Sequence, residues 1–247
     1  MTEIVVTGAS GHVGRALARR IDFRAVGRDD DLAAAVRDAR VAVQLAGSLL
    51  PRRKETYECA NADTARALAE AITAGSNVRR IVLLSYADAG SDPSNAYLAS
   101  KARAERLLAD TGRDIVVVRA AYIYGPPGDV GRSFEPYLAA DDRLVTVIGS
   151  GRQLMAPVHV DAVVDAITRA CEDDAPTGTF SLAGPETLTL DEMIDRINGR
   201  EVRKRHIPPS VARVLAHLSP KLTPTLVDVL LRDCLPHDPP FPVTATV

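Results

Sequence analysis

Cysteine is scarce in this 247-residue chain, and the placement of the few cysteines excludes several kinds of protein. The three, Cys59, Cys171 and Cys234, are odd in number and far apart. They form neither a metal-binding spacing nor a disulfide framework, so no metal site is expected. A reducing, cytoplasmic location fits this pattern.

Long apolar runs and an excess of one charge are absent too. No run approaches the roughly 18 apolar residues that span a bilayer. Glu3 precedes a strand-like run, so no signal peptide is expected. The 30 basic and 32 acidic side chains balance, which predicts no general affinity for nucleic acid or for an anionic membrane. The basic segments PRRK (51–54) and REVRKRH (200–206) are best interpreted as solvated faces, with anion binding as the alternative.

The chain does contain a regular alternation of short β-branched runs with longer alanine-rich segments. Apolar residues make up 46% and charged residues 25%, which is ordinary for a protein with a sizeable core. Strand-like runs occupy 3–8, 23–27, 41–47, 80–85 and 114–120, and helix-like segments occupy 12–20, 31–39, 56–75 and 96–110. This alternation predicts an α/β fold with a Rossmann-type, doubly wound parallel sheet.

The pattern loosens after residue 120. The remaining predicted elements are a turn-rich loop at 122–131, helices at 133–140, 161–172, 210–218 and 223–233, and strands at 144–149 and 178–184. We expect one or two of these strands to extend the main sheet. The predicted organisation is a dinucleotide-binding domain over 1–184, including a substrate-side loop at 122–143, and a small, mostly helical cap over 185–247.

A glycine-rich loop follows the first strand. In TGASGHVG, the strand precedes and a helix follows Gly8, Gly11 and Gly14. In this context glycines let the backbone approach a pyrophosphate at the start of the helix. The candidate cofactor-binding residues of the loop are Thr7, Gly8, Ser10, Gly11, His12, Val13 and Gly14.

The end of the second strand indicates which dinucleotide is bound. An acid there binds the ribose hydroxyls of NAD, whereas an arginine accepts the extra phosphate of NADP. Arg28 directly follows Gly27, which favours NADP. NAD is the alternative, because Asp29 or Asp30 would supply the ribose acid if the register shifts. The aspartate run is also typical of a helix N-cap and first turn.

Tyr97 and Lys101 lie four residues apart, so one helical turn places them on the same face. A free tyrosine, with a pKa near 10, is a poor base at neutral pH. A nearby lysine ammonium favours the phenolate and lowers that pKa, which would make the pair competent for proton transfer.

Taken in order, these segments resemble the short-chain dehydrogenase/reductase superfamily, in particular its extended and atypical, NAD-dependent epimerase/dehydratase-like branches. The resemblance rests on the T-G-x-x-G-x-x-G loop, on YLASK (97–101) as the family's Y-x-x-x-K motif, on Asn61 in NADTARALAEA, and on segments 157–167 and 178–194. It covers nearly the whole chain.

The resemblance implies an NAD(P)-dependent oxidoreductase or epimerase/dehydratase acting on a small-molecule carbonyl or alcohol. Tyr97 would exchange the proton, and Lys101 would also hold the nicotinamide ribose. Leu45, Ala46, Gly47 and Asn61 would line the cofactor site. The resemblance also allows a homodimer. An alternative of another class is an NAD(P)-binding redox sensor or assembly factor without turnover.

The family's third catalytic group, a hydroxyl that contacts the substrate oxygen, is ambiguous here. Ser85 ends the fourth strand, but many relatives carry this hydroxyl one or two places later, where the chain has Tyr86 and Ala87. Either Ser85 or Tyr86 could serve, and Ser85 could instead bond the backbone. The candidate substrate residues are Tyr86, Tyr122 and Tyr124. His159 and Asp161 are interpreted as a strand end and a helix N-cap.

Overall fold

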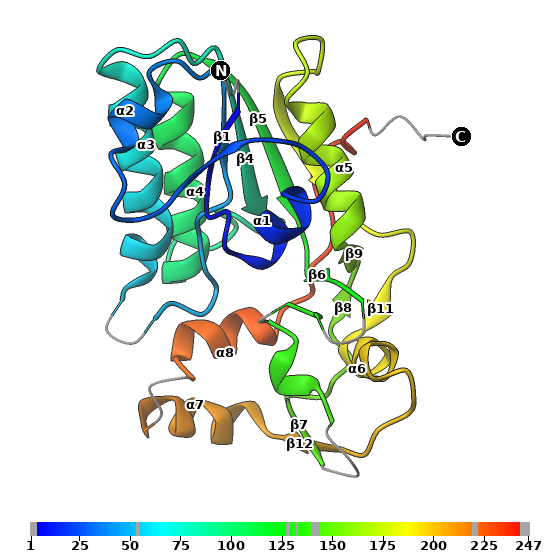
Figure 1. Ribbon diagram of the computed structural model, residues 1–247. Helices are drawn as coiled ribbons and strands as arrows, with labels where there is room; N and C mark the ends of the chain where they lie inside the picture. Colours follow the sequence, from blue (N-terminus) through cyan, green and yellow to red (C-terminus); the bar gives the residue numbers. More distant parts are fainter. Residues whose placement is uncertain are drawn as a thin grey trace.

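Six parallel strands form the central sheet of the computed structural model, which describes residues 4–52, 55–126, 129–131, 133–139, 144–218 and 222–242 (Figure 1). The strands are β1 (Ile4–Thr7), β2 (Arg24–Val26), β3 (Val41–Gln44), β4 (Arg80–Tyr86), β5 (Asp114–Ala120) and β10 (Gly178–Leu182), in the order β10-β5-β4-β3-β1-β2. The predicted doubly wound parallel sheet is confirmed. Glu3, Arg53, Lys54, Pro127 and Gly128 lie outside the described residues.

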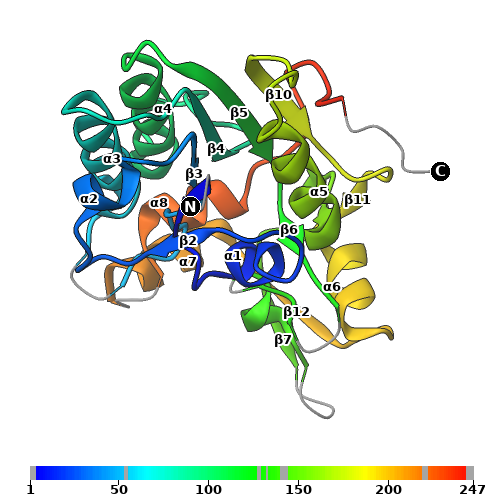
Figure 2. The ribbon, with the colours of Figure 1, turned by 45° about the horizontal axis from the view of Figure 1, so that its top comes forward.

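Helices cover both faces of this sheet (Figures 1 and 2). The helices on one face are α2 (Leu32–Val36), the π-helical turn η1 (Glu58–Ala62), α3 (Asp63–Thr73) and α4 (Ala96–Ala109); those on the other are α1 (His12–Leu17) and α5 (Val160–Ala170). Separate apolar clusters fill the two interfaces. Leu68, Ile72 and Ile81 are fully buried on the first face, and Leu17, Val82 and Ile167 on the second. Because both faces are covered, the strands are apolar on both sides.

The order of the strands differs from the common dinucleotide-binding order at one edge. There β2 is the outermost strand, next to β1, and only the short helix α2 connects it to β3. The common dinucleotide-binding order has a further strand beyond this position, whereas a sheet without it follows the flavodoxin-like order. The edge beside the end of β2 is therefore open.

A smaller lobe lies below the carboxyl ends of the strands (Figure 1). It consists of the 3-10 turn η2 (Glu135–Tyr137), β7 (Val145–Ile148), β8 (Leu154–Met155), β11 (Leu188–Thr189), α6 (Leu190–Asn198), β12 (Lys204–Ile207), α7 (Pro209–Leu218) and α8 (Pro224–Leu230). Between the two parts, β6 (Ile123–Tyr124) pairs with β9 (Val158–His159). A cluster that includes Phe134, Met193 and Ile194 forms the core of the lobe.

One expectation for this region was only partly met, and the expectation that one or two later strands extend the main sheet was met by one strand. The segment predicted as a helix over 133–140 forms only η2 within the described residues, with a proline among its first two positions. The strand predicted at 144–149 exists as β7 but pairs with β12 in a separate two-stranded sheet. Only β10, the second predicted strand, extends the main sheet, where it pairs with β5.

Helix starts follow the predicted caps. The carboxylate of Asp31 accepts a hydrogen bond from the backbone N–H of Ala34, which caps α2 as the aspartate run predicted. His159 ends β9 as predicted, but it is also the N-cap of α5 and accepts from the N–H of Asp161; Asp161, predicted as the N-cap, lies in the first turn of the helix. At α6, Thr189 and Glu192 form a reciprocal capping box.

Candidate active site

The glycine-rich loop connects β1 to α1 at the carboxyl edge of the sheet, and two of its glycines are required by close packing. Gly8 has a φ of +76°, and a Cβ atom on it would lie 2.5 Å from the backbone nitrogen of Ala46. A Cβ on Gly14 would lie 2.4 Å from the carbonyl oxygen of Ala9. Real Cβ contacts are longer, so side chains at either position would displace backbone.

The exposed part of this loop is the part expected to meet a ligand. The N–H of Gly11 donates to the carbonyl of Gly8 at 3.0 Å and closes the turn. Ser10 and Gly11 are exposed, whereas the side chain of Val13 is buried in the sheet–helix core. Val13 could therefore contact a dinucleotide only through its backbone.

The loop after β3 is tied to the glycine loop by a residue that sequence reasoning missed. The hydroxyl of Thr7 donates to the Gln44 side-chain carbonyl at 2.6 Å. The amide nitrogen of Gln44 donates to the carbonyl of Ala46 at 3.2 Å. The N–H of Leu45 donates to the carbonyl of Thr7 at 3.0 Å. The one sequence signal for Gln44 is that it is a polar residue in an otherwise apolar strand.

Lys101 and Asn61 meet this same loop at Gly47. A Cβ on Gly47 would lie 2.8 Å from the side-chain oxygen of Asn61 and 3.6 Å from Nζ of Lys101. Gly8, Ala46, Gly47 and Lys101 thus form a continuous chain of contacts from the glycine loop to α4. The sequence predicted these residues for one cofactor site, and the fold brings them together.

Asn61 joins three segments around the site. Its side-chain oxygen accepts from the N–H of Ser48 at 2.9 Å. Its amide donates to the carbonyls of Ser48 and Tyr57 and to the hydroxyl of Ser100. That hydroxyl in turn donates to the carbonyl of Tyr97 at 2.7 Å. Asn61 lies in the π-helical turn η1, a distortion often found at functional positions.

The ammonium of Lys101 is buried at the end of β4. Nζ donates to the carbonyl oxygen of Leu84 at 3.0 Å, and the residue is 7% exposed. Burial disfavours the charged form and lowers the pKa of Lys101 to about 8, although the nearby Glu105 acts in the opposite direction. Such a strongly shifted group is a typical functional-site candidate.

Tyr97 begins the same helix and is enclosed by aromatic rings. Its ring meets those of Tyr57 and Tyr86 edge-on, with centroids 5.8 and 5.3 Å away. Tyr97 is 6% exposed, and burial raises its pKa well above the ordinary value. Its phenol is therefore protonated at neutral pH in this structure.

The hydroxyl of Ser85 is engaged in an ionic network. It donates to the Glu105 carboxylate at 2.5 Å. Arg119 donates to both oxygens of Glu105, at 3.1 and 2.7 Å, and also pairs with Asp238. Tyr86, the alternative third group, instead touches the Tyr97 ring directly.

The other predicted substrate tyrosines lie on either side of this cluster. Tyr122 is buried and meets Tyr86 edge-on at 6.2 Å. Tyr124 is half-buried against the ring of His159 at 5.2 Å. The Nδ1 atom of His12, at the start of α1, hydrogen-bonds to the carboxylate of Asp129 at 3.0 Å. The loop after β6 therefore reaches back to the glycine loop.

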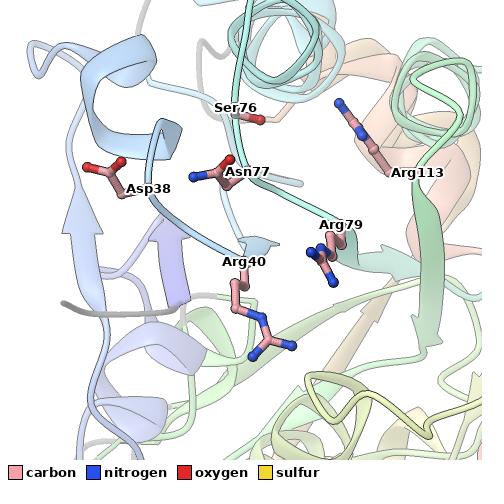
Figure 3. Close-up of a pocket in the computed structure, with 6 residues that line it drawn as sticks. All are labelled: Asp38, Arg40, Ser76, Asn77, Arg79 and Arg113. Atoms are coloured by element: carbon pink, nitrogen blue, oxygen red, sulfur yellow. The ribbon is translucent and has the colours of Figure 1, made fainter.

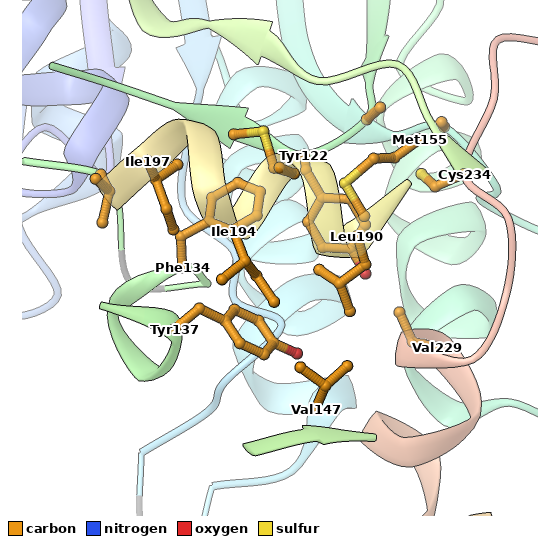
Figure 4. Close-up of a cluster of buried hydrophobic side chains, with 14 of the residues drawn as sticks. Tyr122, Phe134, Tyr137, Val147, Met155, Leu190, Ile194, Ile197, Val229 and Cys234 are labelled. Atoms are coloured by element: carbon orange, nitrogen blue, oxygen red, sulfur yellow. The ribbon is translucent and has the colours of Figure 1, made fainter. Parts of the chain in front are cut away.

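The C-terminal segment covers the lobe side of Tyr97. Figure 4 shows Tyr122, Met155 and Cys234 meeting in the cluster between the sheet and the smaller lobe. The N–H of Cys234 donates to the carbonyl of Leu154 at 2.7 Å. The Tyr57 hydroxyl hydrogen-bonds to the hydroxyl of Thr223 at 3.0 Å, just before α8.

Arg28 lies at the open edge of the sheet, two residues after β2. Its side chain is 57% exposed and pairs with Glu55 at 2.7 Å. The Asp30 carboxylate accepts from the N–H of Gly27, and Asp31 caps α2. Asp30 and Asp31 thus have structural partners, whereas Asp29, the other acid that could bind the ribose hydroxyls of NAD, is exposed beside Arg28. Glu55 was not predicted.

With this geometry in place, the chain can be compared with known proteins. The model of the NAD dependent epimerase/dehydratase family matches residues 52–183, more than half of the chain. The chain belongs to this family. The match begins after the glycine loop and includes Asn61, Tyr97 and Lys101.

Individual relatives of this family member are distant. The chain is 26% identical over 220 residues to the mitochondrial NADH-ubiquinone oxidoreductase 40 kDa subunit of Neurospora crassa, covering 84% of this chain and 54% of that protein. It is 25% identical to a UDP-2-acetamido-2,6-beta-L-arabino-hexul-4-ose reductase of Pseudomonas aeruginosa, covering 97% and 68%. The chain therefore spans about half the length of the first relative.

Solved structures confirm the Rossmann-type fold of this family member. UDP-glucuronic acid 4-epimerase from Bacillus cereus, in complex with NAD, superposes with a TM-score of 0.69 at 19% identity, over 93% of this chain and 96% of that one. The dTDP-4-dehydrorhamnose reductase from Bacillus anthracis, in complex with NADP, gives 0.67 at 17% identity, over 96% and 91%.

Other candidate features lie away from this site. A hollow of about 510 Å³ lies at the amino ends of β3, β4 and β5, opposite the glycine loop (Figure 3). Its lining includes Arg40, Arg79 and Arg113. Among the described residues no group of histidine, cysteine or acidic side chains is placed to hold a metal, and no helix is long and apolar enough to cross a membrane.

Proposed function

We propose that this family member is an NADP-preferring reductase or epimerase acting on a carbonyl or alcohol of a small molecule. The observation that carries the proposal is the chain of contacts from Gly8 through Ala46 and Gly47 to the buried ammonium of Lys101. It joins the dinucleotide loop directly to the predicted proton-transfer pair.

The residues present fit a dinucleotide. The two close-packed glycines hold the loop in a shape that a Cβ would fill, and Ser10 and Gly11 leave it exposed to an anion. Arg28 would bind the 2′-phosphate, because a guanidinium offers a fixed pair of donors to phosphate oxygens. When bound, the nicotinamide donates or accepts the hydride.

The chain's own groups would handle the proton. Tyr97 is protonated at neutral pH, so it could donate a proton to the oxygen of a carbonyl group whose carbon receives a hydride, although the pKa raised by burial makes the phenol a weaker acid. Lys101, when charged, would stabilise the phenolate that this donation leaves. This favours the reducing direction.

The third catalytic group is better assigned to Tyr86 than to Ser85. The hydroxyl of Ser85 donates to Glu105 and that of Tyr86 hydrogen-bonds with Tyr122 and Cys234, so both are engaged, but the ring of Tyr86 lies against Tyr97. Relatives named for UDP- and dTDP-linked keto-sugars suggest a keto group on a nucleotide sugar as the first substrate class to test.

A second candidate is dinucleotide binding without turnover. It is favoured by the burial of Tyr97 at 6% exposure and by Cys234, which lies in the same apolar cluster as Tyr97. In that case the cofactor would bind at the glycine loop, but no substrate would reach Tyr97.

Calorimetric titration with NADPH and NADH, followed by a panel of carbonyls and nucleotide sugars, tests both candidates. Gly8→Ala should abolish binding. The control is Gly112→Ala, which has a similar φ of +67° but open space around a Cβ, and it should bind normally. Binding with turnover supports the enzyme, and binding without any turnover supports the second candidate. If wild type binds neither nucleotide, both are wrong.

A further inference from the structure

Helix α7 presents its large aliphatic side chains to solvent. Val211, Val214, Leu215 and Leu218 are 44, 63, 43 and 78% exposed. Their spacing of three, four and seven residues places them on one helical stripe. Single exposed aliphatic residues are common, but four along one stripe of a ten-residue helix form a contiguous apolar surface.

The opposite side of α7 explains how the helix is held. Ala212 and Ala216 are buried, and they join Ile148 of β7 and Val227 of α8 in a small cluster. The helix thus buries its small residues and exposes its large ones, the reverse of the usual arrangement. Since the inner face is already packed, the outer stripe is not needed to hold α7 in place.

The surroundings of this stripe are basic. Residues 200–218 contain five arginines and lysines and one acid, in a chain whose formal net charge is −2. In β12, directly before α7, Arg203 and Arg205 are exposed. Figure 1 shows α7 and β12 together at the end of the molecule farthest from the central sheet.

Neighbouring acids offset only part of this charge. Lys204 bonds to Asp195 at 2.5 Å, and Arg213 pairs with Asp228 at 3.2 Å. His206 hydrogen-bonds to Asp191. The guanidinium of Arg205 donates to the neutral hydroxyl of Thr146, so its charge is retained.

We propose that the α7 stripe, together with the exposed Arg203 and Arg205 shortly before the helix, docks on an anionic lipid surface. An amphipathic helix with aliphatic residues on one side and basic residues beside it lies in the plane of a membrane interface. Lipid headgroups supply the negative charge that complements the arginines. A ten-residue helix is too short to span a bilayer, so the docking is peripheral.

A second copy of the chain fits this surface less well. Facing two such surfaces would bring the Arg203 and Arg205 side chains of both copies together, and like charges at an interface are unfavourable. The balanced charge of the whole chain predicts no general membrane affinity, so the attraction here is local. The proposal does not depend on catalysis.

Vesicle flotation of the full chain tests the proposed docking of α7 on lipid. Wild type should float with vesicles of phosphatidylglycerol and phosphatidylcholine, with about tenfold weaker partitioning onto phosphatidylcholine alone. The double variant Val214→Asp, Leu218→Asp should lose binding. The variant Arg203→Glu, Arg205→Glu should lose the preference for the anionic vesicles. Val214, Leu218, Arg203 and Arg205 are all exposed, and no ion pair of the two arginines is described. Unchanged thermal unfolding would verify that both variants are folded.

The matched control is Arg79→Glu, Arg113→Glu, which makes the same charge change in the hollow of Figure 3. It should float like wild type. Equal loss in this control would mean that overall charge governs binding and would overturn the proposal, as would absence of wild-type flotation. A wild-type dimer that Val214→Asp, Leu218→Asp dissociates, without vesicle binding, would assign the stripe to a second copy instead.

Discussion

Nζ of Lys101 donates a hydrogen bond to the carbonyl oxygen of Leu84 at 3.0 Å, which fixes a lysine ammonium at the carboxyl end of β4. A Cβ on the adjacent Gly47 would stand 3.6 Å from this ammonium, an ordinary contact, but only 2.8 Å from the side-chain oxygen of Asn61. The relationship brings a helix, a strand end and the loop after β3 to one point.

The pH dependence of turnover should report Lys101. Burial lowers the pKa of Lys101 to about 8, so the ammonium loses its charge as the pH rises through that value. In the proposed mechanism this charge stabilises the Tyr97 phenolate, so kcat/KM should fall above about pH 8. A Lys101→Arg variant keeps its charge over this range and should be slower but without that limb. If kcat/KM of the variant fell over the same pH range, the fall would be due to a group other than Lys101.

Lys101 should also reduce stability at neutral pH. Its pKa is about 8 in the folded chain and about 10.5 when exposed, so unfolding takes up a proton between these values. The free energy of unfolding of wild type therefore rises over this interval. Lys101→Met should exceed wild type in stability at pH 7 by on the order of 1–3 kcal/mol, an advantage that shrinks toward pH 10. Urea unfolding at the two pH values measures it, and a pH-independent difference would contradict the account.

Arg28 should select the cofactor. Arg28→Ala should weaken NADPH binding by about tenfold or more and leave NADH binding nearly unchanged, because only NADPH carries the extra phosphate. Calorimetry measures both affinities. Arg113→Ala, an exposed arginine at the opposite edge of the sheet, serves as the control. Equal losses for the two nucleotides would remove Arg28 from the phosphate site.

Ser85 should act on stability more than on chemistry. Ser85→Ala removes the donor to the charged Glu105, which should cost roughly 1–2 kcal/mol of unfolding free energy and change kcat less than about threefold. Tyr86→Phe should lower kcat more, since it keeps the ring contact with Tyr97 and removes the hydroxyl that the proposal assigns to the substrate oxygen. A kcat loss of about a hundredfold in Ser85→Ala with unchanged stability would instead make Ser85 the third catalytic group.

The sheet was predictable from sequence because its strands are apolar on both faces and alternate with helical segments. The meeting of Gly8, Gly47, Asn61 and Lys101 was also predictable, since the carboxyl ends of parallel strands share one edge. These residues follow strands or begin helices at that edge.

Long-range partners were not predictable. The bond from Ser85 to Glu105, the pairing of Arg28 with Glu55 and the placement of Cys234 in the cluster that contains Tyr97 depend on tertiary contacts that no local pattern encodes. The run at 145–148 had strand character, but its partner β12 lies almost 60 residues later, so the sheet it joins could not be inferred.

The central claim is that Tyr97 transfers the proton beside a dinucleotide held by the glycine loop. Comparing Tyr97→Phe with wild type tests it most directly, by calorimetric NADPH affinity and by NADPH oxidation with a nucleotide keto-sugar. The account predicts unchanged affinity and turnover lower by about a hundredfold or more, because the phenyl ring keeps the packing and loses only the proton. Undiminished turnover in a variant that binds NADPH normally would contradict it.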